Sequence, residues 1–495
     1  MSEEITGSLK GRTVQALKWS FIQEIAGRGV QFVLGIVLAR LLLPQHFGLI
    51  GMLGLFMAVA QAFLDSGLGA ALIQKKHLTE DDKCSIFYFN LAVGLAVAIL
   101  LCLAAPWIAA FYQQPLLVPL TRVLSLSFVI NAFGLVQSAL LMKLIDFKTL
   151  TKINIIASIC SGTLGMVLAF AGWGVWSLAV QQVSSNLLRT VLFWVFNSWR
   201  PSRRFSLTAL RGLFAFSSPL LLAALINEIF ENIYLVVIGR AFSAADLGYY
   251  TRAQSLTQVC SETLGRVANR VTYPVFSSVQ ADVSRLKRGL QKSMTSIGFI
   301  HFPMMIGLAV TAKPLVLVLL TEKWARCVPY VQILCLVGLF FPFHLMNLNA
   351  LTAIGRSDLF LRLEIIKKVL IVGNIALTWR WGIDAMIWGQ VVLSVIAYYL
   401  NSYYVARIID YPLREQVRNL LPYLAAAALM GVAAYAIQGV FATNRLSQLT
   451  AQVLTGVACY ALFCRVFCLA AFSETWLALR SKLFAVRLLR RNKLA

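Results

Sequence analysis

Four charged side chains share one stretch, LGYYTRAQSLTQVCSETLGRVANRVTYPVF at 247–276, which is long enough to cross a membrane as a helix. They are Arg252, Glu262, Arg266 and Arg270. At about 100° per residue, all four fall on one side of that helix. A charge facing lipid is costly, so this stripe is expected to face protein or water. The excess of arginine, which grips phosphate and carboxylate in bidentate fashion, predicts a cationic cavity for an anionic ligand.

Two other interpretations of this stretch remain open. The arginines could serve only to tie helices together, and the whole helix could lie outside the membrane. Helix 19–43 adds a further candidate for the cationic cavity, because Arg28 lies one turn from Glu24. That pair could equally neutralise itself without contacting a ligand. The predicted substrate-binding set is therefore Arg28, Arg252, Arg266 and Arg270.

Carboxylates in apolar segments are candidates for binding a proton or Na⁺, or for pairing with those arginines. Asp65 precedes the glycine-containing stretch SGLG, where a simpler role as a helix cap is also open. Glu228 and Glu231 lie close together on one predicted helix. The candidates for ion coupling or charge pairing are Glu24, Asp65, Glu228, Glu231 and Glu262.

No pattern typical of catalysis is present in the sequence. The nine cysteines are scattered without a CxxC or metal-ligand spacing, so no metal site and no cofactor are expected. There is no Walker A motif, no dinucleotide-binding glycine loop and no Ser/His/Asp arrangement. We therefore expect the protein not to be an enzyme.

The composition is that of a polytopic membrane protein. Of the 495 residues, 59% are hydrophobic and 13% are charged, and the mean hydropathy is +0.77. Soluble domains carry about 25% charged residues. The formal net charge of +24 does not indicate nucleic-acid binding, because the basic residues lie in short loops between apolar runs.

The apolar runs predict an all-α fold with about fourteen transmembrane helices. Lys and Arg are concentrated in both terminal segments and in every second loop, which predicts a multi-pass topology with both termini in the cytoplasm. The basic tail is expected to lie along the inner membrane surface. The predicted helices span 19–43, 47–73, 86–111, 118–142, 151–171, 175–197, 212–239, 247–276, 293–320, 328–354, 363–379, 384–406, 419–440 and 448–472.

The chain also repeats itself at a separation of roughly 200–210 residues. VLARLLLPQHFGLI at 37–50 aligns with VIGRAFSAADLGYY at 237–250. Further on, 118–133 aligns with 328–343, and 173–183 aligns with 381–391. Because six helices precede the repeat point, both halves enter the membrane from the same side. Two such bundles facing a central cavity are typical of transporters.

The predicted architecture has two pseudo-symmetric six-helix lobes followed by two further helices. Residues 1–200 form the N-terminal lobe and 201–410 the C-terminal lobe. Residues 411–475 hold helices 13 and 14, and 476–495 form a basic cytoplasmic tail.

Several stretches resemble a known family, the Wzx-type polysaccharide-transporter flippases of the multidrug/oligosaccharidyl-lipid/polysaccharide exporter superfamily, and above all exporters of the colanic-acid type. The resemblance covers roughly residues 10–410. It rests on LARLLLPQHFGLIGM at 38–52, DSGLGAALIQKKHLTEDD at 65–82, LLMKLIDFKTL at 140–150, NRVTYPVFSSVQADVSRLKRG at 269–289 and TEKWARCVPYVQILCLVGL at 321–339, among others.

This resemblance implies a bacterial inner-membrane flippase. Such a protein moves polyprenyl-pyrophosphate-linked oligosaccharide to the periplasmic leaflet by alternating access, for exopolysaccharide or lipopolysaccharide biosynthesis. Expected partners are that lipid, membrane lipids, a coupling cation (H⁺ or Na⁺) and a polysaccharide polymerase or export machinery, but no nucleic acid. Two alternatives stay open: a cation-coupled multidrug exporter of the same superfamily, and a non-transporting scaffold of a polysaccharide synthesis complex.

Overall fold

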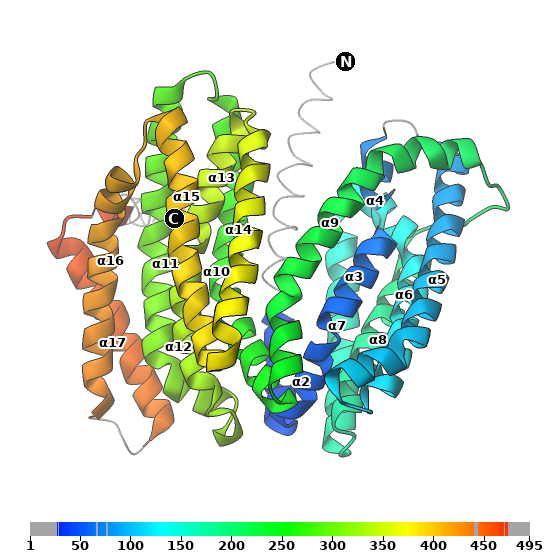
Figure 1. Ribbon diagram of the computed structural model, residues 1–495, viewed down its shortest axis with the longest axis horizontal. Helices are drawn as coiled ribbons and strands as arrows, with labels where there is room; N and C mark the ends of the chain where they lie inside the picture. Colours follow the sequence, from blue (N-terminus) through cyan, green and yellow to red (C-terminus); the bar gives the residue numbers. More distant parts are fainter. Residues whose placement is uncertain are drawn as a thin grey trace, which may run out of the picture. The chain divides into compact units, whose positions relative to one another are not determined.

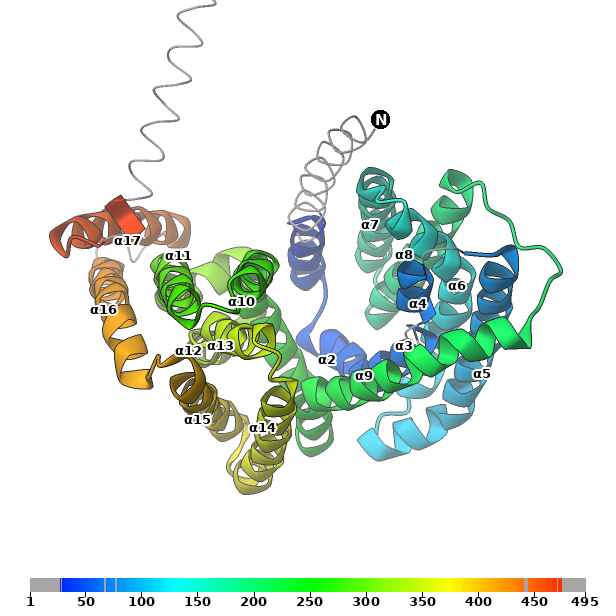
Figure 2. The same cartoon turned by 90° about the horizontal axis from the view of Figure 1, so that it is seen from above.

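The computed structural model describes residues 27, 29–65, 68–75, 78–439, 444–469 and 471–473. Within this part of the chain every secondary-structure element is a helix, as predicted (Figures 1 and 2). The chain divides into two compact units, Met1–Thr251 and Arg252–Ala495. The division into lobes at residue 200 and the boundaries at 410 and 475 stay predictions.

In the first unit the structure describes a helix over Gly29–Leu41, the helices α2 to α9 and the first two turns of α10. Its long helices α5 to α8 run side by side, and α9 packs against α3, α4 and α5 (Figure 1). Its labelled helices are α2 (Pro44–Met52), α3 (Gly54–Asp65), α4 (Leu68–Gln74), α5 (Glu80–Tyr112), α6 (Leu117–Lys143), α7 (Phe147–Phe170), α8 (Val175–Phe196) and α9 (Leu207–Ala241).

The second unit contains most of α10 (Ala244–Ser278) and all later helices. Its last two long helices, α16 and α17, are connected to α11: the Tyr460 hydroxyl of α17 donates to the Phe299 carbonyl at 2.7 Å. The remaining elements are α11 (Val283–Leu319), η1 (Glu322–Trp324), α12 (Cys327–Gly338), α13 (Phe341–Ala353), α14 (Ser357–Thr378), η2 (Trp379–Trp381), α15 (Ile383–Ile409), α16 (Leu413–Ala436), η3 (Ile437–Gly439) and α17 (Arg445–Val466).

The protein is a multi-pass membrane protein. Among the described residues, nine helical segments are long and apolar enough to cross a bilayer, and the bent pair α2 and α3 makes a tenth. The charge-bearing α10 is not among these segments, so its place in the membrane stays a prediction. The total of fourteen spans also stays a prediction.

The continuous helix predicted over 47–73 is wrong, because the structure divides it into α2, α3 and α4. The first break lies at Leu53, where α2 and α3 meet at 44°. There the Leu53 N–H bonds to the Ile50 carbonyl at 3.1 Å, a tight turn in place of the α-helical pattern. The helix predicted over 328–354 is interrupted between α12 and α13, with Pro342 in the first turn of α13, but Cys327–Ala353 still makes one candidate membrane span.

The helix before the break at Leu53, α2, crosses the first turn of α10 very closely. A Cβ built on Gly48 would lie 1.6 Å from the Ala244 carbonyl oxygen. A Cβ built on Gly248 would lie 1.9 Å from the Pro44 carbonyl oxygen. The contact is thus reciprocal, and backbone meets backbone at both positions. Only glycine permits such an approach.

The internal repeat is reproduced in the positions where helices begin. Pro44 and Ala244, which the alignment pairs, are the first residues of α2 and α10. The next aligned stretches begin one residue inside α6 and α12. In the third pair, α8 and α15 both start after a glycine with positive φ, Gly174 at 55° and Gly382 at 98°. The matched sequences therefore encode matched local structure.

The same correspondence holds where α6 and α13 end. The Asp146 N–H bonds to the Leu141 carbonyl at 3.1 Å, and the Arg356 N–H bonds to the Leu351 carbonyl at 3.1 Å. Both helices end in a Schellman motif, in which the residue just before the donating N–H takes a left-handed conformation. In the second half that residue is Gly355 with φ 85°, but in the first half it is Ile145 with φ 59°. A β-branched residue is strained in this region.

We expect Ile145→Gly to stabilise the protein by about 0.5–1 kcal/mol. The Ile145 side chain is 50% exposed, so little buried surface is lost. The reverse change, Gly355→Ile, should destabilise by at least about 1 kcal/mol, because a Cβ there would meet nothing within 4 Å and only backbone strain is added. Thermal-unfolding midpoints in detergent test both variants. Shifts of the same sign would show that φ does not govern these positions.

Candidate functional site

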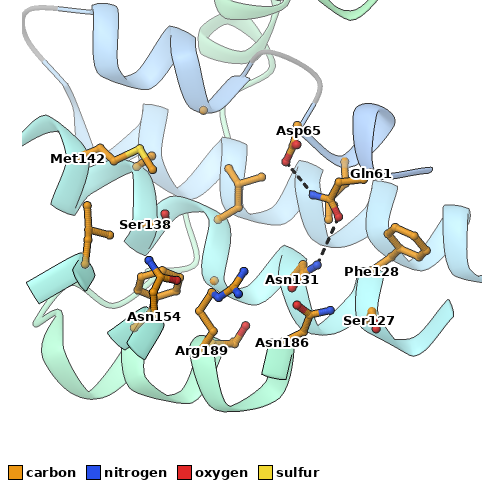
Figure 3. Close-up of a pocket in the computed structure, with 18 of the residues that line it drawn as sticks. Gln61, Asp65, Ser127, Phe128, Asn131, Ser138, Met142, Asn154, Asn186 and Arg189 are labelled. Atoms are coloured by element: carbon orange, nitrogen blue, oxygen red, sulfur yellow. Dashed lines mark hydrogen bonds between the residues drawn. The ribbon is translucent and has the colours of Figure 1, made fainter. Parts of the chain in front are cut away.

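A pocket of about 850 Å³ lies within the first unit, between α3, α4, α6, α7 and α8 (Figure 3). This volume falls in the range of about 300–1,000 Å³ that is typical of small-molecule sites. Its lining combines apolar residues with polar ones. The polar lining residues are Gln61, Asp65, Ser127, Asn131, Ser138, Asn154, Gln182, Asn186, Arg189 and Thr190.

Helical spacing explains why so many polar groups point into one space. On α8, Gln182, Asn186 and Arg189 follow one another at intervals of four and three residues, and therefore share a face. Gln61 and Asp65 are four residues apart on α3, on the opposite wall of the pocket (Figure 3). The pocket thus forms where the polar faces of several helices meet.

A hydrogen-bonded chain orients the carboxylate of the pocket. Asn131 on α6 donates from Nδ2 to Gln61 Oε1 at 3.4 Å. Gln61 in turn donates from Nε2 to Asp65 Oδ1 at 2.9 Å. Asp65, a predicted candidate, therefore lines the pocket, and its role in ion coupling stays a prediction. Glu228 on α9 is close enough to act on Asp65 electrostatically.

Arg189 brings a positive charge into the same pocket. Its side chain extends from α8 toward the interior, with Asn154 and Asn186 on either side (Figure 3). Within the described part of the chain, its Nε is buried without a hydrogen-bond partner, and no ion pair joins it to a carboxylate. A guanidinium at membrane depth requires water or an anionic partner. The pocket therefore offers a cation to a ligand.

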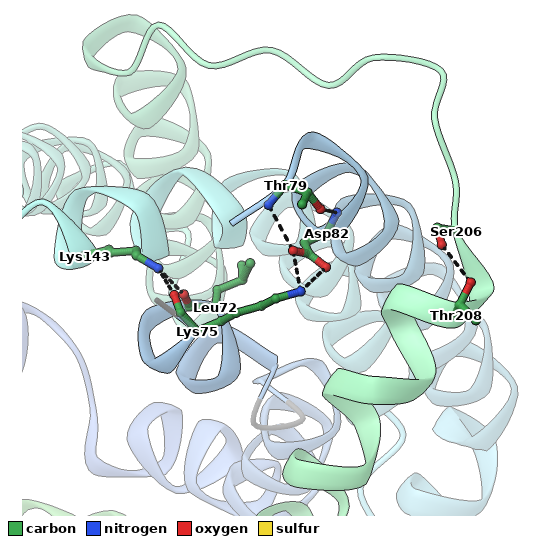
Figure 4. Close-up of polar contacts among 7 residues, drawn as sticks. All are labelled: Leu72, Lys75, Thr79, Asp82, Lys143, Ser206 and Thr208. Carbon is green, nitrogen blue, oxygen red and sulfur yellow. Dashed lines mark hydrogen bonds and ion pairs between the residues drawn. The ribbon is translucent and has the colours of Figure 1, made fainter. Parts of the chain in front are cut away.

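The wall formed by α4 is held in place by two lysines (Figure 4). Lys75, just after α4, contacts both carboxylate oxygens of Asp82 in the first turn of α5, at 2.8 and 2.7 Å. Lys143, the last residue of α6, donates to the carbonyls of Leu72, at 3.2 Å, and of Lys75. Both lysines thus lie where the negative end of the α4 dipole attracts a cation. Through them α4, which supplies Gly69 and Ile73 to the pocket, is fixed to its neighbours.

The arginines predicted to bind substrate are not part of this pocket. Arg252, in the second unit, has its guanidinium carbon 5.9 Å from the centre of the buried Trp324 ring. Arg266 forms an ion pair with Glu262 one turn away on α10. The side chain of Arg270 lies outside the described residues, and so do Glu24 and Arg28. Their roles in binding stay predictions.

The carboxylates predicted on helix 212–239 lie on α9. Glu228 is half-buried, and its side chain accepts a weak hydrogen bond from Asn232 Nδ2 at 3.4 Å. Glu231 has an exposed side chain. Within the described residues, no group of His, Cys, Asp and Glu could hold a metal ion.

Arg189 and the amides around it were not among the residues predicted from the sequence. A signal for them was present: Arg189 stands inside the apolar run 175–197, where a charge is costly. Gln182 and Asn186 precede it at helical spacing. Uncharged Gln61, Asn131 and Asn154 come from three other helices, and no local pattern connects them.

The family of the chain follows from its sequence. Residues 37–329, more than half of the chain, match the family described as "Polysaccharide biosynthesis protein". The teichuronic acid biosynthesis protein TuaB of Bacillus subtilis (strain 168) is 27% identical over 464 residues, which cover 92% of this chain and 95% of that protein. The lipopolysaccharide biosynthesis protein WzxC of Escherichia coli (strain K12) is 28% identical over 376 residues, covering 75% and 76%.

The fold has a solved counterpart. The lipid II flippase MurJ, in its inward closed conformation, matches with a TM-score of 0.76 at 14% sequence identity. The match covers 91% of this chain and 98% of that one. The chain thus belongs to the polysaccharide biosynthesis protein family and has the fold of that flippase.

Proposed function

We propose that the protein is a flippase that moves a polyprenyl-pyrophosphate-linked oligosaccharide from the cytoplasmic to the periplasmic leaflet of a bacterial inner membrane. The observation that carries this proposal is the large pocket among apolar helices, whose lining includes amides, hydroxyls, one guanidinium and one carboxylate among its described residues. Oligosaccharides offer many hydroxyls, which pair with amide and hydroxyl side chains. Family membership and the named relatives support the same function.

The mechanism that we propose is alternating access. The head group passes through a hydrated, polar interior while the polyprenyl tail stays in lipid, since neither part is stable in the other's environment. The proposal includes a topology with both termini in the cytoplasm, which the distribution of Lys and Arg among the loops predicts. A gradient of H⁺ or Na⁺ is the proposed driving force, with Asp65 and Glu228 as the first carboxylates to test.

The pyrophosphate is assigned, as a proposal, to the cationic set Arg28, Arg252, Arg266 and Arg270. Its charge needs several cations, and arginine provides bidentate contacts. Because Arg266 is already paired with Glu262, binding there would require the anion to replace or join that carboxylate. A transporter working in this way needs no catalytic residue. Its product would pass to a polymerase or export machinery.

The alternative is an exporter of cationic drugs. In this pocket Asp65 would attract a cationic drug and Arg189 would repel it, so the charges of the lining do not favour such a substrate. A non-transporting scaffold would have no use for such a pocket. A direct measurement of lipid translocation therefore separates the flippase from these two alternatives.

A strain that lacks the gene is expected to accumulate complete lipid-linked repeat units that a periplasmic glycan probe cannot reach. The intact gene should restore access, and an Arg266→Ala form should restore it at least tenfold less well, because a contact to charged phosphate is worth roughly 1.5–3 kcal/mol. The measurement is glycan labelling on intact and on lysed spheroplasts. Normal labelling of intact cells, in a strain without a second flippase, would contradict the proposed function.

A further inference from the structure

We propose that the pocket around Arg189 binds an acidic sugar of the substrate, with the guanidinium on the sugar carboxylate and the surrounding amides on its hydroxyls. The inference rests on the proposed function and names the class of glycan that this site takes. In this proposal Arg189 binds the negative charge of the saccharide, whereas the pyrophosphate of the lipid carrier is assigned to the other arginines.

The charges of the pocket match a single carboxylate and not a pyrophosphate. Among the lining residues that the structure describes, Arg189 is the one cation and Asp65 the one carboxylate. A pyrophosphate would bring at least two negative charges toward one arginine and one like-charged group. A sugar acid brings one negative charge for the arginine. Its hydroxyls can donate to Asp65 at the same time.

The orientation of the arginine favours a planar anion. Arg189 Nε is buried and has no hydrogen-bond partner among the described residues, so its N–H is available to an acceptor on a ligand or on water. A carboxylate placed side-on to the guanidinium accepts from Nε and from one terminal nitrogen at once. Leaving that N–H unpaired costs free energy, which a ligand carboxylate removes.

The neutral groups around Arg189 suit a carbohydrate. Asn154 and Asn186 flank the guanidinium, and Asn131 lies across from it on α6 (Figure 3). Each amide carries two donors and one acceptor, and each sugar hydroxyl is both donor and acceptor. Phe128 and Phe193 add apolar surface to the same pocket. The volume of about 850 Å³ has room for more than one sugar ring.

The test compares two substrates that differ only at the acid. One is a polyprenyl-pyrophosphate disaccharide ending in glucuronate, and the other is its carboxyl-reduced form, which ends in glucose. Binding is measured to the full-length protein in nanodiscs, and translocation in proteoliposomes. The natural protein should prefer the acidic substrate by roughly 10–100-fold, because hydrogen bonds to a charged group contribute about 1.5–3 kcal/mol.

In the Arg189→Gln variant that preference should fall to near unity, with the affinity for the acidic substrate reduced at least tenfold more than that for the reduced one. Arg189→Lys should keep part of the preference, because lysine retains the positive charge but cannot make the two parallel hydrogen bonds of a guanidinium. Asn186→Asp should also weaken it, by placing a competing carboxylate one turn from Arg189. Arg122→Gln, which removes an exposed arginine elsewhere on α6, is the matched control and should leave the preference unchanged.

The outcomes separate this inference from the proposed function. If Arg189→Gln weakens both substrates equally, Arg189 serves the carrier that they share, and the inference is wrong. If it weakens neither, or if the natural protein does not distinguish the two, the inference is also wrong while transport stands. If the natural protein translocates neither substrate in a sealed, energised vesicle, the proposed function itself fails.

Discussion

Replacing Gly48 with alanine is expected to destabilise the protein by at least about 3 kcal/mol, the upper part of the usual range for overpacking. The added Cβ would lie 1.6 Å from the Ala244 carbonyl oxygen, far inside contact distance. That neighbour is backbone in the first turn of α10, so no side-chain rotation can make room. The helices α2 and α10 would have to separate.

The same argument applies to Gly248→Ala, whose Cβ would lie 1.9 Å from the Pro44 carbonyl oxygen. Because both changes separate the same pair of helices, the double variant should lose less than the sum of the two single losses. Gly373→Ala is the control, since a Cβ at that position of α14 meets nothing within 4 Å. It should be neutral or stabilise by up to about 1 kcal/mol.

The measurement is the free energy of unfolding, obtained by titrating each purified variant from mild detergent into SDS. Losses at Gly48 and Gly248 that are no larger than at Gly373 would show that α2 and α10 do not meet as the structure has them. Strict additivity would show that the two glycines belong to independent contacts.

Replacing Asp82 with alanine is expected to destabilise by about 2–4 kcal/mol. The carboxylate is only 1% exposed, and it holds Lys75 through both oxygens. It also accepts from the Thr79 backbone N–H at 3.0 Å, as part of the capping box that starts α5. The estimate lies below that for a fully buried pair, because the Lys75 side chain is 41% exposed and can return to water.

The control for Asp82 is its neighbour Asp81, which is exposed and carries the same charge in the same helical turn. Asp81→Ala should lose only its interaction with the α5 dipole, about 0.3–1 kcal/mol. Thermal-unfolding midpoints in detergent rank the two variants. An equal effect at both positions would show that the contact with Lys75 contributes nothing.

Much of the fold could be predicted from the sequence because each apolar run has the length of a membrane helix. The all-α class is confirmed, and the aligned repeats begin helices at matching positions, such as Pro44 and Ala244. The break at Leu53 could not be predicted in the same way. It accompanies a contact between segments about 200 residues apart, and hydropathy within 47–73 is continuous across it.

The site was predictable only in part. Asp65 was a candidate because a carboxylate in an apolar run is conspicuous. Arg189 is also a charged residue in an apolar run, although it was not among the predicted residues. Asn131 and Asn154 carry no charge, so their positions in the sequence do not mark them. Periodicity shows which residues share a face of one helix. It does not show which faces of α3, α6, α7 and α8 enclose a common space.

The helix α9 has a consequence for how the protein is made. By the repeat it opens the second half, yet it packs within the first unit, where Leu235 and Asn232 face Gly54 of α3. While the ribosome is still extending the chain, a bundle ending at α8 leaves that side of α3 without its protein neighbour. The first unit is completed only by a helix that the second repeat supplies. Folding of the first unit therefore depends on synthesis of the first helix of the second repeat, although the sequences of the two halves repeat.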